Sequence, residues 1–564
     1  MGLFNKIKLI KPRRSVFRLS HSVRTTMNIG EIVPTCFVEM VPGDTFRFGQ
    51  VATVELQPLV APFKGDLWQE SAAFFVPYDI LALDDEDKFT QILATVVDTQ
   101  SSVPIPKWDF ESSKVDSQGN LLSTKLGTLW DKYGFPLNVQ GLENSITPIA
   151  YLQRAYYSVY NEYLRDENMD LEHDLIGNEL MTICYKKDNF TSAFDSPQKG
   201  VAPSLQLTGT ASSEWATGLL NTIIGEVVNI SKVSSVGGGQ GSTSHVEIAS
   251  GTSLKIDGNS ISAFPNNNTS TVSGTGTKQD SKLGVKVDQN FLDFLNNNLL
   301  QMSNIITFNI NDLRLLNKLQ IWLERNQLAG SRTKEYLLAN YGIAPSDETL
   351  QRPQFLGRLR TPVIVNSNLS SVEYVNGQTR VPQGTKSGNG TAQNAVLFKK
   401  WTCKEPGLIL VLSWLRPKAT YSQGINRMWI KDSVYDYCNP IFQNLGQQPI
   451  YNCELFADNS TVDANGVKVD TKVFGFEDRY TEMKYIPDIT TGELRANESL
   501  DVWAVSRHFA SHPTLSSEFI HVNKSDYDYL FAVQDQPQAV VTFNNIIKAV
   551  RPLHKFSMPT LGVA

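Results

Sequence analysis

Hydrophobic runs of strand length recur along this chain, and turn-forming residues bound most of them. The clearest run follows Pro42-Gly43-Asp44, where apolar and polar side chains alternate over residues 45–56 with the period of a half-buried strand. Its predicted buried face carries Phe46, Phe48, Ala52, Val54 and Leu56, and its other face carries Arg47, Thr53 and Glu55. Strands of this kind need a second layer to cover the apolar face.

Further strands are predicted by the same signals. The run 68–76 is apolar on both faces and ends at Pro77, as expected for a strand buried inside a sandwich. Asn465-Gly466 indicates a two-residue hairpin. Four more strands are predicted at residues 395–402, 407–415, 467–476 and 500–509.

Helical spacing is confined to three segments. Thr147 can cap a helix with Pro148 in its first turn, and apolar residues then recur at helical spacing as far as Tyr163. A second helix is predicted from about residue 312 to a stop at Gly330, and a third over residues 333–341. Many strands with a few helices in their connections predict an all-β sandwich with long loop insertions.

Composition narrows the class of protein. The 564 residues can bury a large core, and the hydrophobic fraction of 41% is that of an ordinary globular protein. No apolar run approaches the roughly 20 residues of a membrane span, so no membrane insertion is expected. Lys6 and Lys8 interrupt the N-terminal apolar stretch, which therefore does not resemble a secretory signal.

The cysteines are odd in number and widely spaced. This pattern favours reduced core thiols over a disulfide framework or a zinc site. The residues are Cys36, Cys184, Cys403, Cys438 and Cys453.

The first thirty residues are basic and contain no acid. They carry +7, so the rest of the chain carries −13 of the net charge of −6. A basic arm on an acidic body commonly contacts a polyanion, although a solvated arm, or one paired with the body, is an open alternative. The candidate nucleic-acid-binding residues are Lys6, Lys8, Lys11, Arg13, Arg14, Arg18 and Arg24.

Residues 231–280 differ from the rest of the chain in composition. Gly, Ser, Thr and Asn make up 29 of these 50 residues, and Phe264 is the only aromatic residue, so the segment cannot bury much apolar surface. An exposed or disordered loop is predicted, inside a larger insertion at about residues 201–305.

No motif for catalysis or cofactor binding is present, so neither a catalytic residue nor a cofactor is predicted. His508 and His512 are four residues apart but have no third metal ligand nearby, which favours ordinary loop or strand histidines. Residues 461–472 resemble a calcium loop, but Thr461 and Lys472 hold its first and last ligand positions, so a hairpin is preferred. The acids at 84–87 favour a solvated helix start over a cation site.

Several stretches, taken in order, resemble the major capsid proteins of the microviruses, small icosahedral phages with single-stranded DNA, and in particular their gokushovirus branch. They run from residue 15 to residue 559 and cover most of the chain outside 201–305. The stretches are SVFRLSHSVRTTMNIG, VPGDTF, YLQRAYYSVYNEYLRDEN, DNFTSAFDSPQKG, DLRLLNKLQIWLERNQLAGSRTKEYLLANYGI, LQRPQFLG, TYSQGINRMW, NLGQQPI, FGFEDRYTEMKY, LDVW and KAVRPLHKFSMP.

This resemblance implies an eight-stranded viral jelly roll. It also implies that about sixty copies build an icosahedral shell around a circular single-stranded DNA genome. The insertion at 201–305 resembles, by its position, the insertion that forms surface protrusions thought to meet the host in such phages.

The resemblance divides the chain into four predicted parts. They are a basic N-terminal arm at 1–30, a first part of the jelly roll with a helical insertion at 31–200, the protruding insertion at 201–305, and the rest of the jelly roll with the C-terminal segment at 306–564.

Several partners are expected. They are further copies of the chain, the single-stranded DNA genome, a host cell-surface receptor, and scaffolding and pilot proteins. About sixty arms would supply about 420 positive charges, too few to neutralise a packaged genome, so small cationic partners are expected as well, either a small basic packaging protein or polyamines. The protein is expected in the virion, after assembly in the host cytoplasm.

Two questions stay open at the level of sequence. Aromatic residues such as Tyr156, Tyr160 and Trp429 fit a contact between subunits and a subunit core equally well.

The alternative functions are a host-recognition or carbohydrate-binding β-sandwich spike and a glycoside hydrolase of sandwich fold. A spike would form small oligomers instead of closed shells, and a secreted hydrolase would need a signal peptide and a carboxylate pair.

Overall fold

The computed structural model divides into two compact units, one of residues 1–200 with 322–564 and one of residues 201–321. The structure describes residues 13–84, 88–89, 92, 105–110, 114–117, 120–139, 147–203, 234–235, 243–246, 254–256, 259–261, 270–273, 310–329, 332–376, 379–398 and 400–556.

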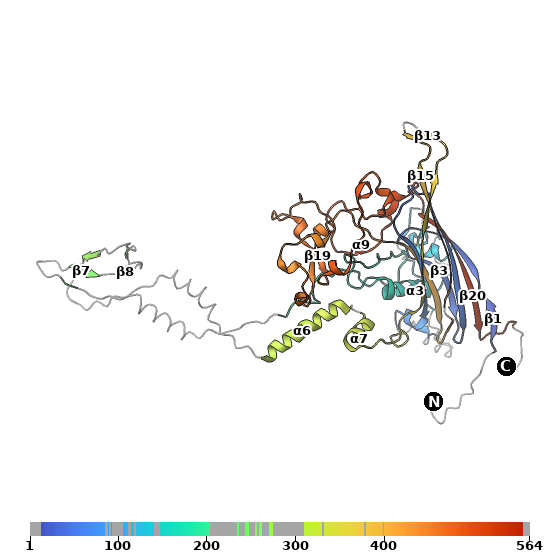
Figure 1. Ribbon diagram of the computed structural model, residues 1–564. Coiled ribbons are helices and arrows are strands. Elements are labelled where there is room, and N and C mark those ends of the chain that lie inside the picture. Colours follow the sequence, from blue (N-terminus) through green and yellow to red (C-terminus); the bar gives the residue numbers. More distant parts are fainter. Residues whose placement is uncertain are drawn as a thin grey trace, which may run out of the picture. The chain divides into compact units, whose positions relative to one another are not determined.

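The larger unit is built on two antiparallel sheets (Figure 1). The seven-stranded sheet has the order β1-β20-β4-β15-β12, with β2 also paired to β20 and β16 to β4. Its strands are β1 (Ser15–Arg18), β2 (His21–Met27), β4 (Thr45–Leu56), β12 (Ile364–Leu369), β15 (Lys386–Leu397), β16 (Trp401–Thr402) and β20 (Ala539–Arg551). The four-stranded sheet has the order β11-β5-β17-β3, with β3 (Val33–Met40), β5 (Leu67–Pro77), β11 (Gln354–Pro362) and β17 (Gly407–Pro417).

The strand order confirms the jelly roll. In chain order its eight strands are β2, β3, β4, β5, β11, β15, β17 and β20. The first strand, β2, pairs with the eighth, β20, and the second, β3, pairs with the seventh, β17. The third, β4, lies between β15 and β20, and the fourth, β5, lies between β11 and β17. This double Greek key places the first, third, sixth and eighth strands in one sheet and the second, fourth, fifth and seventh in the other, which is the jelly-roll arrangement.

The predicted strand faces agree with the structure. Phe46 and Phe48 of β4 are buried between the sheets, where they meet Phe75 of β5 and Ile409 of β17. Strands β5 and β17 are buried along nearly their whole length. The reason is that their other face is also covered: Phe74 packs against Tyr163, with ring centroids 5.0 Å apart.

The connection between β5 and β11 carries four of the six α-helices described, together with shorter helical turns. They are η1 (Tyr78–Leu81), η2 (Leu122–Thr124), α2 (Leu129–Lys132), α3 (Tyr151–Val159), η3 (Tyr160–Leu164), α6 (Ile310–Ala329) and α7 (Thr333–Tyr341). The helix predicted from Thr147 begins only at Tyr151, because Pro148 and Ala150 bond to the backbone of residues 106–108 instead. Helix α7 ends at Gly342 as predicted, with φ +70°.

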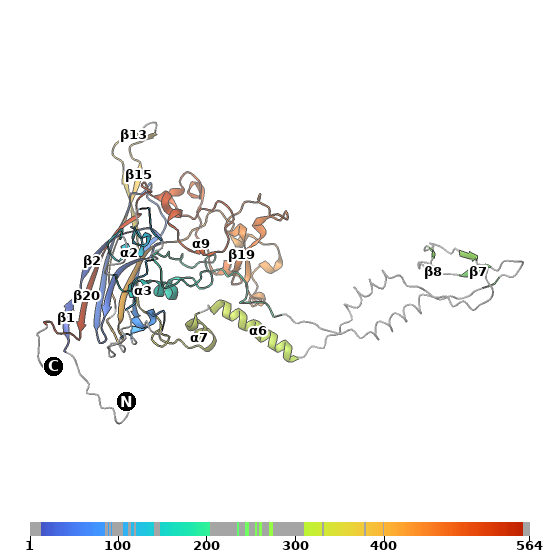
Figure 2. The same cartoon turned by 180° about the vertical axis from the view of Figure 1, so that it is seen from behind.

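The connection between β17 and β20 is long and mostly irregular. It carries β18 (Gln448–Tyr451), β19 (Val473–Glu477), α8 (Thr481–Lys484), α9 (Ser517–Ile520) and the short 3-10 turns η5 (Arg427–Trp429), η6 (Val434–Asp436), η7 (Pro440–Phe442), η8 (Asn452–Glu454), η9 (Val469–Thr471), η10 (Gly492–Leu494), η11 (Asp501–Trp503) and η12 (Lys524–Leu530). In both ribbon views β19 and α9 lie beyond α3, and β1, β2 and β20 lie at the opposite margin (Figures 1 and 2).

Two strand predictions in this connection need correction. The strand predicted at 500–509 is wrong: the segment forms η11 and then an irregular stretch in which Val505, Ser506 and Arg507 are all buried. The strand predicted at 467–476 begins only at Val473, because the buried Asp470 accepts hydrogen bonds from the backbone of 458–459 and turns the chain. The predicted run 395–402 also differs, since β15 begins earlier, at Lys386, and ends at Leu397.

The Asn465-Gly466 turn is present, with Gly466 at φ +77° and a single bridge between Val462 and Lys468.

The smaller unit is described by short strands. β6 (Ser234–Ser235), β7 (Thr243–Val246) and β10 (Ser270–Ser273) form one antiparallel sheet, and β8 (Leu254–Ile256) pairs with β9 (Asn259–Ile261). The rest of the loop predicted at 231–280 lies outside the described residues.

In the larger unit, a hairpin of β13 (Tyr374–Asn376) and β14 (Thr379–Val381) lies between β12 and β15 in the sequence. Among the helices described, none is both long and apolar enough to cross a bilayer.

Candidate nucleic-acid interface and apolar loop surface

Part of the predicted basic arm belongs to the jelly roll. Lys6, Lys8 and Lys11 lie outside the described residues. From Ser15 onward the chain forms β1 and then β2, and both pair with the C-terminal strand β20. Arg18 and Arg24 therefore have fixed places on a sheet, whereas Arg13 and Arg14 precede it.

Three cations lie side by side on the face of the seven-stranded sheet that points away from the four-stranded sheet. Arg18 of β1 is opposite Lys548 of β20, and Lys548 is in turn opposite Arg47 of β4. All three are exposed, while their sequence neighbours Phe17, Ala549 and Phe46 point into the sandwich. Like charges directly opposite each other on a sheet are unfavourable. We call these three residues the basic row.

The rest of this face is mainly polar and aliphatic. Arg24 is opposite Thr542, and Ser22 donates a hydrogen bond to the side-chain oxygen of Asn544 (2.6 Å). Ile546 is 53% exposed between these positions and the basic row. On the described strands β1, β2, β4 and β20, the exposed charged residues of this face are Arg18, Arg24, Arg47, Lys548 and one acid, Glu55. The face is therefore positively charged in a molecule of negative net charge.

Arg14 is in a different electrostatic setting from the basic row. Its guanidinium lies near the Gly43 turn and acts on the buried Asp44, together with Arg551, whose Nε lies 3.2 Å from Asp44 Oδ2. Burial raises the pKa of Asp44, while the Val41 amide and the two arginines oppose that rise. Arg14 is thus partly neutralised within the chain.

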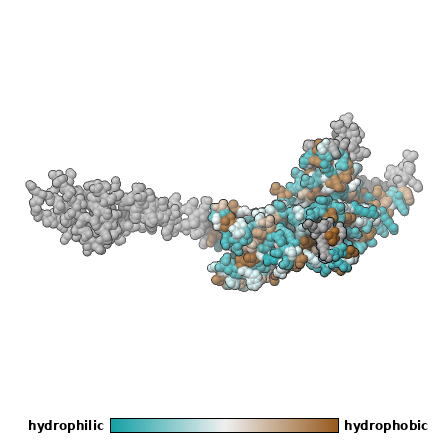
Figure 3. All heavy atoms as spheres, turned by 90° about the horizontal axis from the view of Figure 1, so that it is seen from above, coloured by the Kyte–Doolittle hydropathy of each residue, from teal (hydrophilic) through white to brown (hydrophobic). Residues whose placement is uncertain are grey.

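Exposed apolar side chains are also frequent in the loops of the β17–β20 connection, and we call this set the apolar loop surface. Its members are Trp429, Val434, Tyr435, Tyr437, Ile441, Leu445, Ile486 and Ile489, each at least 59% exposed. In the space-filling view, apolar side chains gather in separate brown patches among hydrophilic ones (Figure 3). Exposed patches of this kind commonly mark protein–protein contacts.

The structure separates the aromatic residues that the sequence left undecided. Tyr156 and Tyr160 of α3 and η3 are at most 3% exposed and belong to the core. Trp429 is 77% exposed and belongs to the apolar loop surface.

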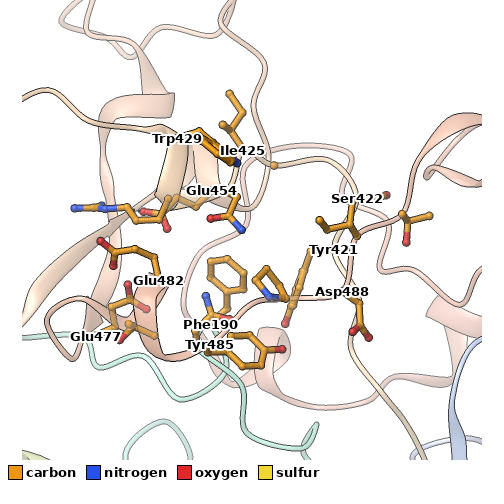
Figure 4. A pocket seen from close by; sticks show the side chains of 18 of the residues that line it. Phe190, Tyr421, Ser422, Ile425, Trp429, Glu454, Glu477, Glu482, Tyr485 and Asp488 are labelled. Carbon is orange, nitrogen blue, oxygen red and sulfur yellow. Dashed lines mark hydrogen bonds and ion pairs between the residues drawn. The ribbon is translucent and has the colours of Figure 1, made fainter. Parts of the chain in front are cut away.

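Beside Trp429 the loops enclose a pocket of about 290 Å³. Glu454, Glu477 and Glu482 lie on one side of it, away from Ser422 and Asp488 (Figure 4). Two of these acids have cation partners: Arg427 Nη1 is 3.0 Å from Glu454, and Lys431 Nζ is 3.2 Å from Glu482.

Glu477 differs from its two acidic neighbours. Its Oε1 accepts a hydrogen bond from the Gln448 amide (2.8 Å), and its Oε2 is buried without a hydrogen-bond partner. Burial, aided by the charges of Glu454 and Glu482, raises its pKa to about 7. Nothing in the sequence spacing identified this group of acids, because it joins η8, β19 and α8.

The other candidates from the sequence belong to neither of these two sets of residues. His512 Nε2 is 2.5 Å from Asp470, and His508 is 3.9 Å from Asp501. Lys472, at the last position of the calcium-like loop, forms an ion pair with Asp463 (2.8 Å). Of the acids at 84–87, residues 85–87 lie outside the described residues. All five cysteines are free, and Cys36, Cys184 and Cys403 are buried.

Two members of the basic row were missed at the level of sequence. Arg47 was placed on the polar face of its strand, and Lys548 was not considered. Their alignment with Arg18 depends on the register between strands about 500 residues apart, which no local pattern encodes.

The chain is similar to phage proteins over nearly its whole length. The model of a family described as capsid protein (F protein) matches residues 5–561. Capsid protein VP1 of Chlamydia phage 1 is 29% identical, over 99% of this chain and 97% of that protein. Capsid protein VP1 of Bdellovibrio phage phiMH2K is 26% identical, over 99% of this chain and 97% of that protein. Capsid protein VP1 of Spiroplasma virus 4 is also 26% identical, over 97% of this chain and 95% of that protein.

Proposed function

The chain belongs to the capsid protein (F protein) family of microvirus-type phages and is a component of the virion, and we propose that its copies assemble into an icosahedral shell around a circular single-stranded DNA genome. Self-assembly needs surfaces that lose water on contact, and enclosure of DNA needs a surface that tolerates phosphate. The apolar loop surface is the candidate for contacts between copies, and the face that carries the basic row is the candidate for contact with DNA.

The observation that carries the DNA proposal is the basic row. Three aligned cations without an acid among them favour a polyanion as their counter-charge. Contacts to the backbone of single-stranded DNA need no base recognition, and aliphatic residues such as Ile546 can lie against sugars and bases. The sheet face, together with Arg24 and the arm residues Lys6, Lys8, Lys11, Arg13 and Arg14, is the proposed inner surface of the shell.

The test is the triple variant R18Q/R47Q/K548Q, expressed with the phage's other genes. We expect shells to form and to contain less nuclease-protected DNA than wild-type shells. With isolated subunits and a single-stranded oligonucleotide, the slope of log binding constant against log salt should fall by about 2, at about 0.7 per phosphate contact.

A matched control removes the same charge elsewhere. Lys468, Lys472 and Lys484 are exposed lysines of the β17–β20 connection, and their triple Gln variant should package DNA normally. Equal DNA content in the two variants would contradict the proposed interface. Small oligomers without any shell, from the wild-type chain itself, would favour the spike alternative.

For self-assembly, the apolar loop surface is the proposed contact with neighbouring copies. Aromatic and aliphatic residues of this kind are favoured in the desolvated centre of protein interfaces. Ile441→Asp places a charge in such a contact and should stop shell formation while the subunit stays folded. Leu171→Asp is the control, because Leu171 is 93% exposed in a different connection and should leave assembly intact. Normal shells from Ile441→Asp would contradict the assignment.

For host attachment, the proposed segment is the insertion at 201–305, most of which lies outside the described residues. Its support is its polar composition and its place in the sequence, inside the β5–β11 connection and between strands of the jelly roll. Deleting 231–280 should leave shells intact and lower adsorption to host cells. A receptor, a small basic packaging protein, and scaffolding and pilot proteins are the further proposed partners.

A further inference from the structure

Three side chains with metal-binding atoms meet at one point outside the sandwich. They are Asp170, which follows η3, Cys184, which lies at an isolated bridge to residue 521, and His521, which follows α9 directly. One carboxylate oxygen, the thiol sulfur and one imidazole nitrogen all lie within 4.8 Å of one another. The sequence gives no hint of this cluster, because its members are separated by up to 351 positions.

The distances are close to those of a tetrahedral site. Cys184 Sγ is 3.8 Å from His521 Nε2, and Asp170 Oδ2 is 2.8 Å from the same nitrogen. Zinc bonds of about 2.3 Å to sulfur and about 2.0 Å to nitrogen hold those two atoms roughly 3.5 Å apart. A zinc ion therefore fits between the thiol and the ring after a small outward shift of the carboxylate.

The imidazole is already oriented for such a role. Its Nδ1 lies 3.1 Å from the carbonyl oxygen of Thr182 and 2.9 Å from the hydroxyl of the same residue. In metal sites the second ring nitrogen of a histidine ligand commonly donates to a backbone carbonyl, which fixes the tautomer and leaves the other nitrogen for the metal. Here that other nitrogen is Nε2, which faces Cys184 and Asp170.

The carboxylate offers a further acceptor. Asp170 Oδ1 is buried and has no hydrogen-bond donor on it. A buried acceptor without a partner costs free energy, and a bound cation would satisfy it. The side chains of Asp170 and His521 are 8% and 9% exposed, so bulk water screens the site little.

The surrounding charges limit which ion fits. Arg165 donates to the backbone carbonyl of Asp170 (2.6 Å), and the positive charge of Arg416 also acts on Cys184. A divalent ion beside two arginines needs ligands that cancel its charge, and a thiolate with a carboxylate does so. Sulfur and imidazole ligands select zinc over magnesium and calcium, which prefer oxygen.

We propose that Asp170, Cys184 and His521 bind one zinc ion, independently of the shell and DNA functions proposed above. Cys184 also lines a cavity of about 640 Å³, from which a water molecule can supply the fourth ligand. Zinc binds the thiolate of Cys184 and the neutral Nε2 of His521, so its affinity is expected to fall as the pH is lowered. The ion would join the β5–β11 connection to the β17–β20 connection.

The first test measures metal in the full-length protein. Purified protein should contain about one zinc per chain, and cobalt added after chelation should give the near-ultraviolet charge-transfer band of a cobalt–thiolate bond. Cys184→Ser should abolish that band and lower zinc affinity more than tenfold, whereas Cys438→Ser, which changes an exposed cysteine, should leave both unchanged.

A second measurement needs no variant to fold. Chelation of the wild-type protein should lower its melting temperature, and added zinc should restore it. The proposal is overturned if the folded wild-type protein binds neither zinc nor cobalt, in which case the three residues form an ion pair with a buried thiol. It is also overturned if Cys184→Ser retains the cobalt band, because the metal then binds elsewhere.

Discussion

Two groups of three cations lie on the two sheets of the sandwich, and among the described residues only one of these groups forms ion pairs with an acid. On the four-stranded sheet, Arg358, Arg360 and Arg416 all form ion pairs with Glu70, whose side chain is 1% exposed. On the seven-stranded sheet, the basic row of Arg18, Lys548 and Arg47 has no acid among its members.

The difference shows what each sheet is built to contact. Glu70 also accepts a hydrogen bond from the indole nitrogen of Trp414 (2.7 Å), so the acid, the indole and the arginines form one closed polar network. Such a network holds β5, β11 and β17 together through their side chains. The basic row leaves its charge available to whatever covers that face of the sheet.

The largest expected effect comes from removing the acid of the closed network. Glu70→Gln leaves Arg416, whose side chain is only 13% exposed, without its counter-charge, whereas Arg358 and Arg360 can turn toward solvent. We expect a loss of about 3 kcal/mol in the free energy of unfolding, at the lower end for a broken buried pair. Urea denaturation of the isolated subunit measures it, and a loss below about 1 kcal/mol would show that the network is not essential.

Glu477 is buried without a cation of its own, so its negative charge should destabilise the fold, whereas the negative charge of Glu70 stabilises it. The pKa of Glu477 is raised from 4.5 to about 7 by burial, so the folded chain binds a proton there that the unfolded chain releases. Stability should therefore fall as pH rises from about 4.5 to 7, by up to about 3 kcal/mol. Glu477→Gln should flatten that dependence.

The control for this pH effect is Glu498→Gln, which changes an exposed acid and should keep the wild-type profile. If wild-type and Glu477→Gln proteins show parallel profiles of unfolding free energy between pH 4.5 and 7, Glu477 does not carry the effect.

The smallest effect on stability is expected from the basic row itself. R18Q/R47Q/K548Q removes exposed like charges, so the free energy of unfolding should change by less than about 0.5 kcal/mol, with a slight gain at low salt. The same substitutions have a large expected effect on DNA content. A loss of several kcal/mol in the isolated subunit would mean that the row is structural and would remove the contrast with Glu70.

The fold was largely predictable because its strands carry local signals. The alternation in β4 and the doubly apolar pattern of β5 each reflect which faces are covered, and both predictions were confirmed. The strand predicted at 500–509 failed because its apolar residues pack in an irregular loop. Arg507 there lies over the Phe519 ring (4.2 Å) and donates to the Phe519 carbonyl, so no strand partner is needed.

The candidate surfaces were predictable only in part. The charge of the N-terminal segment pointed to Arg18, but its partners Lys548 and Arg47 become visible only through strand register. Aromatic composition marked both Tyr156 and Trp429, and only the packing of α3 against the sheet distinguishes the buried residue from the exposed one. Positions that depend on contacts between distant segments are beyond a local pattern.

The place of β20 has a consequence for how the protein is made. This strand, at residues 539–551, lies between β4 on one side and β1 and β2 on the other. The strands β1, β2 and β4 are synthesised early, but they cannot pair with β20 until it has left the ribosome. Until then β4 and β2 each lack a neighbour, and unpaired strand edges readily join other chains. Folding should be slow, since it depends on contacts between strands about 500 residues apart, and the sheet can be completed only after β20 has been synthesised. A cell that produces many copies at once therefore contains many chains whose sheet is incomplete. Such chains can bind chaperones, or they can associate with one another before they have folded.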